Sequence, residues 1–591
     1  MHVISWNVAG LKQTVKRIHD NYGPEHASNG KKMPASAALH EYMKRHDVDI
    51  FCLQEAKIPI QQLSSRSEPL SSSTVEGYES FWSCCTDKKK LGFNGVVTYA
   101  KKGTVRRADA FALGASELDD QGRCVMTDHG TFVIFNVYVP ASGGNSLTYK
   151  MKFLHALRRA MKKERQIKPV ILVGDLNISH TKLDRYWSDR VIQVDEILEQ
   201  IRGHGDGPDV PLWKRDVAKS WEKIETVLAT KEIIETQTTN SRTGAKYDKF
   251  RLCVSVDGVR VYLGGHESSK ECCEYFYQFD EWHYECPETG DLKPASIKNE
   301  VSIVVLSELM NKIAGIEWNE TLQRQIADDQ EGIARISPTR QWLECIIQQD
   351  EMVDVFRHFY PTAKDRFTCW NQYTNRRYVN EGCRIDYTLV DKSLLPMVRK
   401  GQVESLRTGG SKHDPLGEEA AICAATANGE FEPVPFEGNG IMEATQTALD
   451  TQFGLKHSGM IYTPPSFSDH IGVSLLMDAA FCPRDLILDE KDRATRKAQP
   501  HKAQTTIASF FSGDGYVPLE SNDATTQKKR MALSTVEVQK RSSSFVASRR
   551  CSEKPEAIPV TTNLVAKRVK RSCSVVQPTS KPGSIPHFFR K

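Results

Sequence analysis

Short runs of β-branched and aromatic residues recur through most of residues 1–480, and many of them end in polar side chains. The clearest run is "KPVILVGDLNIS", from Lys168 to Ser179, in which an apolar stretch leads directly into an acid and an amide. Apolar runs of this length, bounded by turn residues, are typical of β-strands. The pattern therefore predicts a core built around β-sheet, with chemistry at the ends of the strands.

Helical stretches separate some of these runs. The segments "ALHEYMKRH" and "TYKMKFLHALRRAMKKERQ" carry apolar residues near helical spacing, and each precedes a predicted strand. Strands and helices mixed over this length predict a layered α/β protein. The predicted strands are "HVISWN", "VDIFCLQE", "GVVTYAKKG", "GTFVIFNVYVP", "VILVGDLN", "RIDYTLV" and "FSDHIGVSLLM".

The length of 591 residues is too great for one ordinary core, so it predicts one large domain with insertions, or two domains. Residues 203–330 and 403–460 lack the strand pattern, and we interpret them as insertions in a catalytic domain of residues 1–484. No apolar run reaches the roughly 18 residues that cross a bilayer, and no secretory signal precedes the first strand. We therefore expect no membrane partner, and reduced, packed cysteines.

Residues 485–591 have a different composition, rich in Ser, Thr, Lys and Arg. From Ala503 to Lys591 there are 15 Lys and Arg against 6 Asp and Glu, a net charge of +9. The total is +4, so the rest of the chain carries −5. This composition predicts a disordered basic tail, and it excludes a body that binds nucleic acid through overall positive charge.

Acidic and amide side chains gather at the ends of the predicted strands. If those ends converge, they form a pocket of hard oxygen ligands with one imidazole, which favours Mg²⁺ or Mn²⁺ over zinc. A metal beside a carboxylate and a histidine suits phosphodiester hydrolysis. Taken singly, each acid is better explained as a turn or cap residue, and spacing alone does not establish convergence. The residues concerned are Glu55, Asp175, Asn177, Asp386, Asp469 and His470.

The order of the motifs adds a family resemblance. "ISWNVAGL", "LQEAK", "NVYVP", "GDLNISH", "GCRIDYTLV" and "FSDH" follow one another as in the exonuclease III-type AP endonucleases of the endonuclease/exonuclease/phosphatase superfamily. "SPTRQWL" and "FTCWNQYTN" resemble the AP endonuclease 2 branch. The resemblance implies a four-layer α/β/β/α sandwich of the deoxyribonuclease I type, with the site where two sheets meet. It also implies a DNA-repair nuclease for abasic sites and damaged 3′ ends.

The resemblance further implies a role for each site residue. Asp175 would activate water, Asn177 would orient the attack or bind phosphate, and Tyr138 would contact phosphate or the leaving oxygen. His470, paired with Asp386, would contact the scissile phosphate. The implied metal ligands, for Mg²⁺ or Mn²⁺, are Asn7, Glu55 as the principal one, Asp175, Asn177, Asp469 and His470.

Two departures from the family pattern bear on the substrate. Ala9 stands where some relatives have an aspartate, and "ASGG", residues 141–144, replaces the Asn and Ala-Gly-Arg that follow "YVP" in the main endonuclease branch. A phosphate-contacting amide and a DNA-inserting arginine are thereby missing. This favours 3′-to-5′ exonuclease or 3′-end cleaning at least as much as incision at abasic sites.

The tail carries a peptide, "QTTIASFF", that resembles the PIP box by which proteins dock on the replication sliding clamp. Gln504 would enter a side pocket, while Ile507, Phe510 and Phe511 would form an apolar plug on a 3₁₀-like turn. "SIPHFF", with Ile585, Phe588 and Phe589, resembles a weaker second copy. The basic clusters at residues 528–530 and 567–571 favour a nuclear location.

Three other interpretations compete with that of a clamp-bound DNA-repair nuclease. A catalytically weak, clamp-bound repair scaffold is disfavoured because every chemical residue is present. A superfamily relative acting on RNA or a phosphoinositide is disfavoured by the "RIDY" and "TCWN" stretches and the clamp peptide. A zinc site in the first insertion is also disfavoured, because its spacing fits no common pair of ligands. Its candidates are Cys253, Cys272, Cys273, His283 and Cys286.

Overall fold

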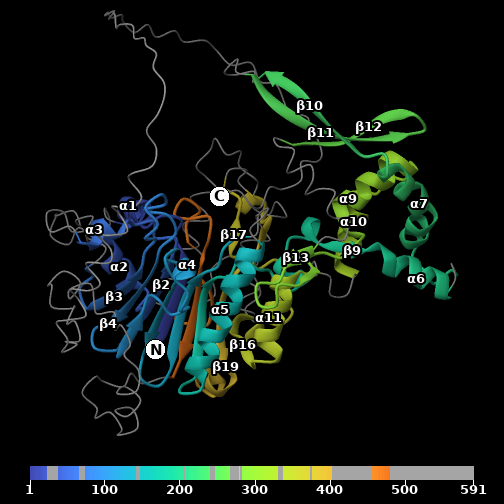
Figure 1. Ribbon diagram of the computed structural model, residues 1–591. Helices are drawn as coiled ribbons and strands as arrows, with labels where there is room; N and C mark the ends of the chain where they lie inside the picture. The colour runs from blue at the N-terminus through green and yellow to red at the C-terminus, as the bar shows by residue number, and fades with distance from the viewer. Residues whose placement is uncertain are drawn as a thin grey trace, which may run out of the picture. The chain divides into compact units, whose positions relative to one another are not determined.

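The structure is a computed structural model (Figure 1). It describes residues 1–22, 37–64, 74–141, 147–204, 207–239, 246–266, 279, 283–329, 337–372, 376–401, 456–461 and 463–478. The predicted disordered tail, most of the second predicted insertion and the clamp-binding residues Gln504, Ile507, Phe510 and Phe511 lie outside these ranges. In the described part of the chain, no helix is long and apolar enough to cross a membrane.

Two large mixed sheets form the centre of the fold (Figure 1). The first has the order β20-β22-β1-β2-β4-β3, with β21 also pairing with β22, and the second has the order β16-β19-β8-β7-β6-β5. The first consists of β1 His2–Asn7, β2 Ile50–Gln54, β3 Tyr78–Ser83, β4 Val96–Lys101, β20 Val398–Arg399, β21 Gly459–Ile461 and β22 Gly472–Met477. The second consists of β5 Arg107–Asp109, β6 Cys124–Asp128, β7 Val133–Tyr138, β8 Val170–Asp175, β16 Met352–Asp354 and β19 Asp386–Asp391.

The two sheets pack against each other through one face of each. In β8, Ile171 and Val173 belong to the apolar layer between the sheets, whereas Val170 and Leu172 face the opposite side. This alternation follows from the two-residue period of a strand, and the strands are apolar on both faces because both faces are covered. Every strand predicted from the sequence is present in one of these two sheets.

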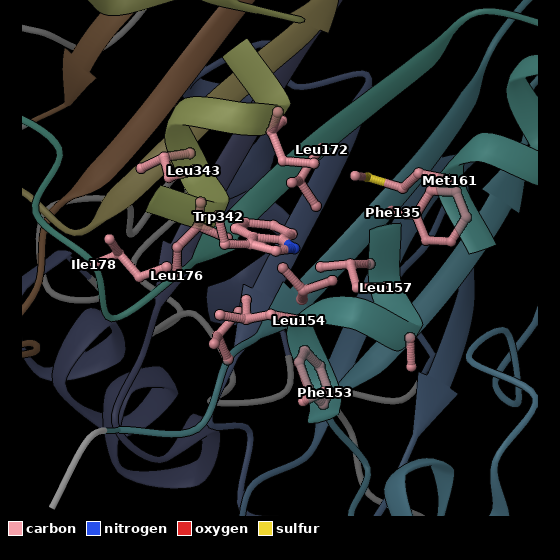
Figure 2. Close-up of a cluster of buried hydrophobic side chains, with 14 of the residues drawn as sticks. Phe135, Phe153, Leu154, Leu157, Met161, Leu172, Leu176, Ile178, Trp342 and Leu343 are labelled. Carbon is pink, nitrogen blue, oxygen red and sulfur yellow. The ribbon is translucent and has the colours of Figure 1, made fainter. Parts of the chain in front are cut away.

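Helices cover the outer face of each sheet, which completes four layers. Helices α1 (Leu11–Tyr22) and α2 (Ala38–Arg45) pack on the first sheet through a cluster that includes Trp6 and Phe51. Helices α5 (Leu147–Arg165) and α11 (Pro338–Gln348) pack on the second, where Trp342 meets Leu157 and Leu172 (Figure 2). The predicted α/β/β/α sandwich is confirmed. The shorter helices of this body are α3 Ile60–Ser64, α4 Ser116–Asp119, η5 Lys182–Asp184, η6 Trp187–Asp189, α12 Val355–Phe359, η8 Arg376–Val379 and η9 Lys392–Met397.

A separate apolar cluster lies in the range that contains the first predicted insertion. It is built around Trp213, Trp221 and Trp318, and it takes in residues from Ile192 to Ala327. The region therefore has a core of its own, which a merely solvated loop would lack. Its elements are β9 Val191–Gln193, α6 Val194–His204, α7 Leu212–Leu228, β10 Glu232–Thr239, β11 Lys246–Val256, β12 Val259–His266, β13 His283–Glu285, β14 Leu292–Pro294, β15 Glu300–Ser302, α9 Ile303–Leu309, the π-helical turn η7 Met310–Ala314 and α10 Glu320–Asp329.

Candidate active site

The site begins where the apolar layer between the sheets ends. Ile171 and Val173 face that layer, so Asp175 takes the next inward position of β8. Tyr138 is its register partner on β7, and Asp386 is its register partner on β19. All three side chains therefore continue the inward-facing rows of their strands at one edge of the sandwich. The abrupt change from apolar to acidic residues in "VILVGDLN" marks this edge.

The backbone around Asp175 is fixed by two unusual residues. Gly174 has φ +132°, and a Cβ there would lie 2.0 Å from the carbonyl oxygen of Val137, so no other residue fits. Asn177 is left-handed, with φ +52°, and its backbone N–H donates to Asp175 Oδ1 at 2.9 Å. The turn after β8 thus holds the carboxylate in one orientation.

Asn7 connects the two sheets at this edge. Its amide nitrogen donates to Glu55 Oε1 at 3.0 Å and to Asp175 Oδ2 at 2.9 Å. Glu55 follows β2 in a left-handed conformation, with φ +49°, and its other oxygen pairs with Lys57 Nζ at 2.9 Å. The amide therefore ties a carboxylate of the first sheet to a carboxylate of the second.

His470 enters the site from the segment before β22. Its Nδ1 lies 2.9 Å from Asp386 Oδ2, and its Nε2 lies 3.9 Å from Asp175 Oδ2. Burial by itself would lower the pKa of His470, but the charge and hydrogen bond of Asp386, with Asp175 and Asp469, raise it to about 10. The imidazole is therefore a cation at neutral pH, fixed by Asp386 and directed at Asp175.

Asp175 is held in the opposite electrostatic balance. Burial, and then the negative charge of Asp386, raise its pKa above the ordinary value, although His470 and the Asn7 amide act against this. A raised pKa makes the carboxylate a stronger base than an exposed aspartate. In this group Asp175 is the proton acceptor, Asp386 is the acid that orients the imidazole, and His470 is the cation.

The donor atoms fit a hard divalent cation. Among the residues that the structure describes, one group has ligand atoms within 4.8 Å of one another: Asp175, Asp386 and His470. Asp386 Oδ1 is buried with no hydrogen-bond partner, which is costly unless a ligand or ion reaches it. As a cation, His470 would donate hydrogen bonds and would not ligate a metal, so the predicted metal role of His470 depends on its losing a proton.

The remaining predicted residues lie around this group. Asp469 precedes His470, and the Ser468 hydroxyl lies 3.4 Å from Asp469 Oδ1. The Asn177 side chain donates to the Val139 carbonyl oxygen at 2.9 Å, so its amide nitrogen is engaged with the backbone. In the first predicted insertion, Cys253, His283 and Cys286 form no metal-binding group in the described residues.

Residues 4–221, which contain β1, β2, β7 and β8, match the sequence model of the endonuclease/exonuclease/phosphatase family. Over these residues the chain is similar to that family.

The chain is also similar to two individual proteins with different names. The chain is 28% identical to DNA-(apurinic or apyrimidinic site) endonuclease 2 of Bos taurus over 463 residues, 72% of this chain and 62% of the relative. It is 28% identical to an exodeoxyribonuclease of Bacillus subtilis over 186 residues, 31% of this chain and 61% of the relative. The chain thus spans less than two thirds of either relative. A crystal structure of the Xenopus laevis APE2 catalytic domain aligns over 82% of this chain and 95% of that chain, with a TM-score of 0.38 and 18% identity.

Sequence reasoning missed two cations beside this site. Lys150 of α5 is fully buried and donates from Nζ to the Asn177 carbonyl oxygen at 2.8 Å, and burial lowers its pKa to about 7. Arg123 lies over the Tyr138 ring at 4.6 Å and donates to the Tyr138 carbonyl oxygen. A signal existed for Lys150, because it lies three residues after Leu147 and four before Leu154, on the apolar face of the helix.

Proposed function

We propose that this protein is a metal-dependent DNA phosphodiesterase of base-excision and single-strand-break repair, which cleans damaged 3′ ends and cleaves abasic sites. The observation that carries the proposal is the contact group of Asp175, Asp386 and His470 at the rim of the two sheets. The names of the relatives support the DNA substrate. Ala9 and residues 141–144 depart from the family pattern, and these departures favour the 3′-end activity over cleavage at abasic sites.

In this mechanism Asp175 accepts a proton from the attacking water, because its raised pKa matches it to that task. His470, held as a cation by Asp386, stabilises the negative charge that develops on the phosphate oxygens. Asn7 keeps Glu55 and Asp175 at a fixed separation. Tyr138 is the register partner of Asp175, and in this proposal its hydroxyl contacts phosphate or the leaving oxygen.

The cofactor in this proposal is Mg²⁺ or Mn²⁺. Glu55 and Asp469 would hold it with Asn7 and with the Asp175 carboxylate, and Asn177 and a deprotonated His470 complete the set of candidates. A bound divalent cation neutralises phosphate charge and lowers the pKa of bound water. Apart from the His470 nitrogen, the candidate ligand atoms are oxygens of carboxylates and amides, which would suit these two ions better than zinc.

Two labelled duplexes test the function directly. One carries an internal abasic-site analogue, and the other carries a recessed, mismatched 3′ end. We expect stepwise shortening of the second in Mg²⁺ or Mn²⁺, weaker incision of the first, and no reaction after chelation. Rescue by zinc alone would contradict the hard-oxygen site, and internal incision without shortening would make the protein an abasic-site endonuclease only.

Sliding-clamp binding is part of the proposal and rests on the peptide from Gln504 to Phe511. Replacing both phenylalanines, Phe510→Ala with Phe511→Ala, removes most of the apolar plug, so we expect at least a tenfold loss of affinity for the clamp in calorimetry. Turnover on short free DNA should not change. The same double change at Phe588 and Phe589 is the matched comparison, and an unchanged affinity in both variants would remove clamp coupling.

The second candidate function is a catalytically weak, clamp-bound repair scaffold. Such a protein would bind the clamp and DNA but would shorten neither duplex in either metal.

The nuclear location proposed here rests on the two basic clusters of the tail, and imaging of a variant with residues 567–571 neutralised would test it.

A further inference from the structure

Two cysteines lie directly opposite each other beside the candidate active site. Cys369 of β17 (Cys369–Trp370) is the register partner of Cys383 of β18 (Gly382–Cys383). The neighbouring Cys383 thiol and burial raise the pKa of the Cys369 thiol above its ordinary value. Opposed residues of antiparallel strands have Cα atoms about 4.5–5.5 Å apart, within the range of roughly 4.4–6.8 Å that a disulfide spans. Both thiols are free, and Cys369 is partly exposed.

The ribbon that carries the cysteines is unusually close. A Cβ on Gly382 would lie 2.7 Å from the Cys369 carbonyl oxygen and 2.6 Å from Trp370 Nε1. Only glycine allows the two strands to approach in this way. The pair is therefore held together by the backbone and does not depend on a chance rotamer of either cysteine.

The other edge of β17 carries the catalytic histidine. The backbone N–H of Trp370 donates to the Asp469 carbonyl oxygen at 3.0 Å, and the backbones of Cys369 and His470 form an isolated antiparallel β-bridge. The Thr368 hydroxyl accepts the backbone N–H of Asp386 at 3.1 Å. A shift of β17 toward β18 would therefore move both members of the His470–Asp386 pair.

We propose that Cys369 and Cys383 are a redox modification site, at which a peroxide converts the two thiols into a disulfide that stops turnover at the adjacent His470. The effect on turnover rests on the proposed nuclease function, whereas formation of the bond does not. No cysteine of this pair takes part in the hydrolysis itself.

The oxidation has two balanced steps. The Cys369 sulfur attacks one peroxide oxygen, the O–O bond breaks, and a sulfenic acid and one water result. The Cys383 sulfur then displaces the sulfenic oxygen, which leaves as a second water with the Cys383 proton. Two thiols lose two electrons and two protons, and one peroxide becomes two waters.

The bond must bring the two sulfurs to about 2 Å from each other, which changes the positions of both cysteine side chains beside His470. A misplacement of about 1 Å in a catalytic group can cost about 100-fold in rate. We therefore expect at least a tenfold fall in turnover in the oxidised protein, and full recovery after a dithiol reductant.

The experiment treats the full-length protein with hydrogen peroxide, blocks the remaining thiols, and identifies linked peptides by mass spectrometry. The same samples are assayed on the recessed 3′-end duplex. The proposal predicts a Cys369–Cys383 peptide whose yield follows the loss of activity, and both should reverse with dithiothreitol. Absence of that peptide, or a fully linked protein with unchanged activity, would overturn it.

Two variants separate this pair from the other cysteines. Cys383→Ser keeps a hydrogen-bonding group opposite Cys369, and it should retain activity in reducing buffer and resist peroxide. Cys345→Ser on α11 is the matched control, because Cys345 is the other cysteine described as partly exposed. It should remain sensitive, and equal sensitivity of Cys383→Ser would refute the site. If the wild type forms the peptide but cleaves neither duplex, the modification site stands and the nuclease function fails.

Discussion

Asp175→Asn should reduce the rate of DNA hydrolysis by about 1000-fold or more, because an amide cannot accept the proton of the attacking water. The measurement is single-turnover cleavage of the recessed 3′-end duplex in saturating Mg²⁺. Binding of that duplex should change far less, since the loss concerns a step that occurs only in the transition state.

The fold of this variant should not weaken. Burial and the neighbouring Asp386 raise the pKa of Asp175, which means that its carboxylate is less stable in the fold than in water. A neutral amide of the same shape removes that penalty but also loses one of the two hydrogen bonds that the carboxylate accepts, so the melting temperature should change little. Asp209→Asn is the control, because it makes the same chemical change at an exposed aspartate that is not part of the site. Retained turnover in a folded Asp175→Asn protein would exclude Asp175 as the base.

Arg384→Leu should destabilise the protein by about 3–5 kcal/mol, because it removes the centre of a buried ion network. Arg384 is 1% exposed and donates from Nε to Asp184 Oδ1 at 2.7 Å and from Nη2 to Asp354 Oδ2 at 2.6 Å. Burial would raise the pKa of Asp184, but Arg384 and Arg357 lower it below its ordinary value. Without Arg384, Asp184 keeps Arg357 as a cationic partner, whereas the buried Asp354 carboxylate loses the guanidinium that pairs with it. Urea unfolding followed by circular dichroism measures the loss.

The control for this prediction is Arg324→Leu. Arg324 pairs with Glu320 one helical turn away, and both side chains are more than half exposed. Such pairs contribute about 1 kcal/mol or less, so the variant should unfold close to the wild type. If Arg384→Leu also unfolds close to the wild type, the network is dispensable for stability. Arg384 lies two residues before Asp386, the first residue of β19, so the loss of the network should also disturb the orientation of Asp386.

The strands were predictable because their signals are local, whereas their arrangement in four layers was implied by the family resemblance. A run such as "VILVGD" is apolar on both faces, and that pattern is typical of a strand covered on both sides. The residues of the site were predictable for the same reason, since a polar side chain at the end of a buried strand stands out from its neighbours. Lys150 was missed because a lysine in a helix is most often solvated, and its burial depends on a partner 27 residues away.

The sequence by itself determined the strands, the flanking helices and the identities of the polar residues at the strand ends, because each of these depends on neighbours within a few positions. Only the tertiary structure decided which of them meet. Asp175, Asp386 and His470 are far apart in the chain, and their contact arises from the antiparallel pairing of β19 with β8 and from the segment before β22. A separate backbone β-bridge between distant segments placed Cys369 beside His470. Contacts of this kind depend on the register between strands, which no local pattern encodes.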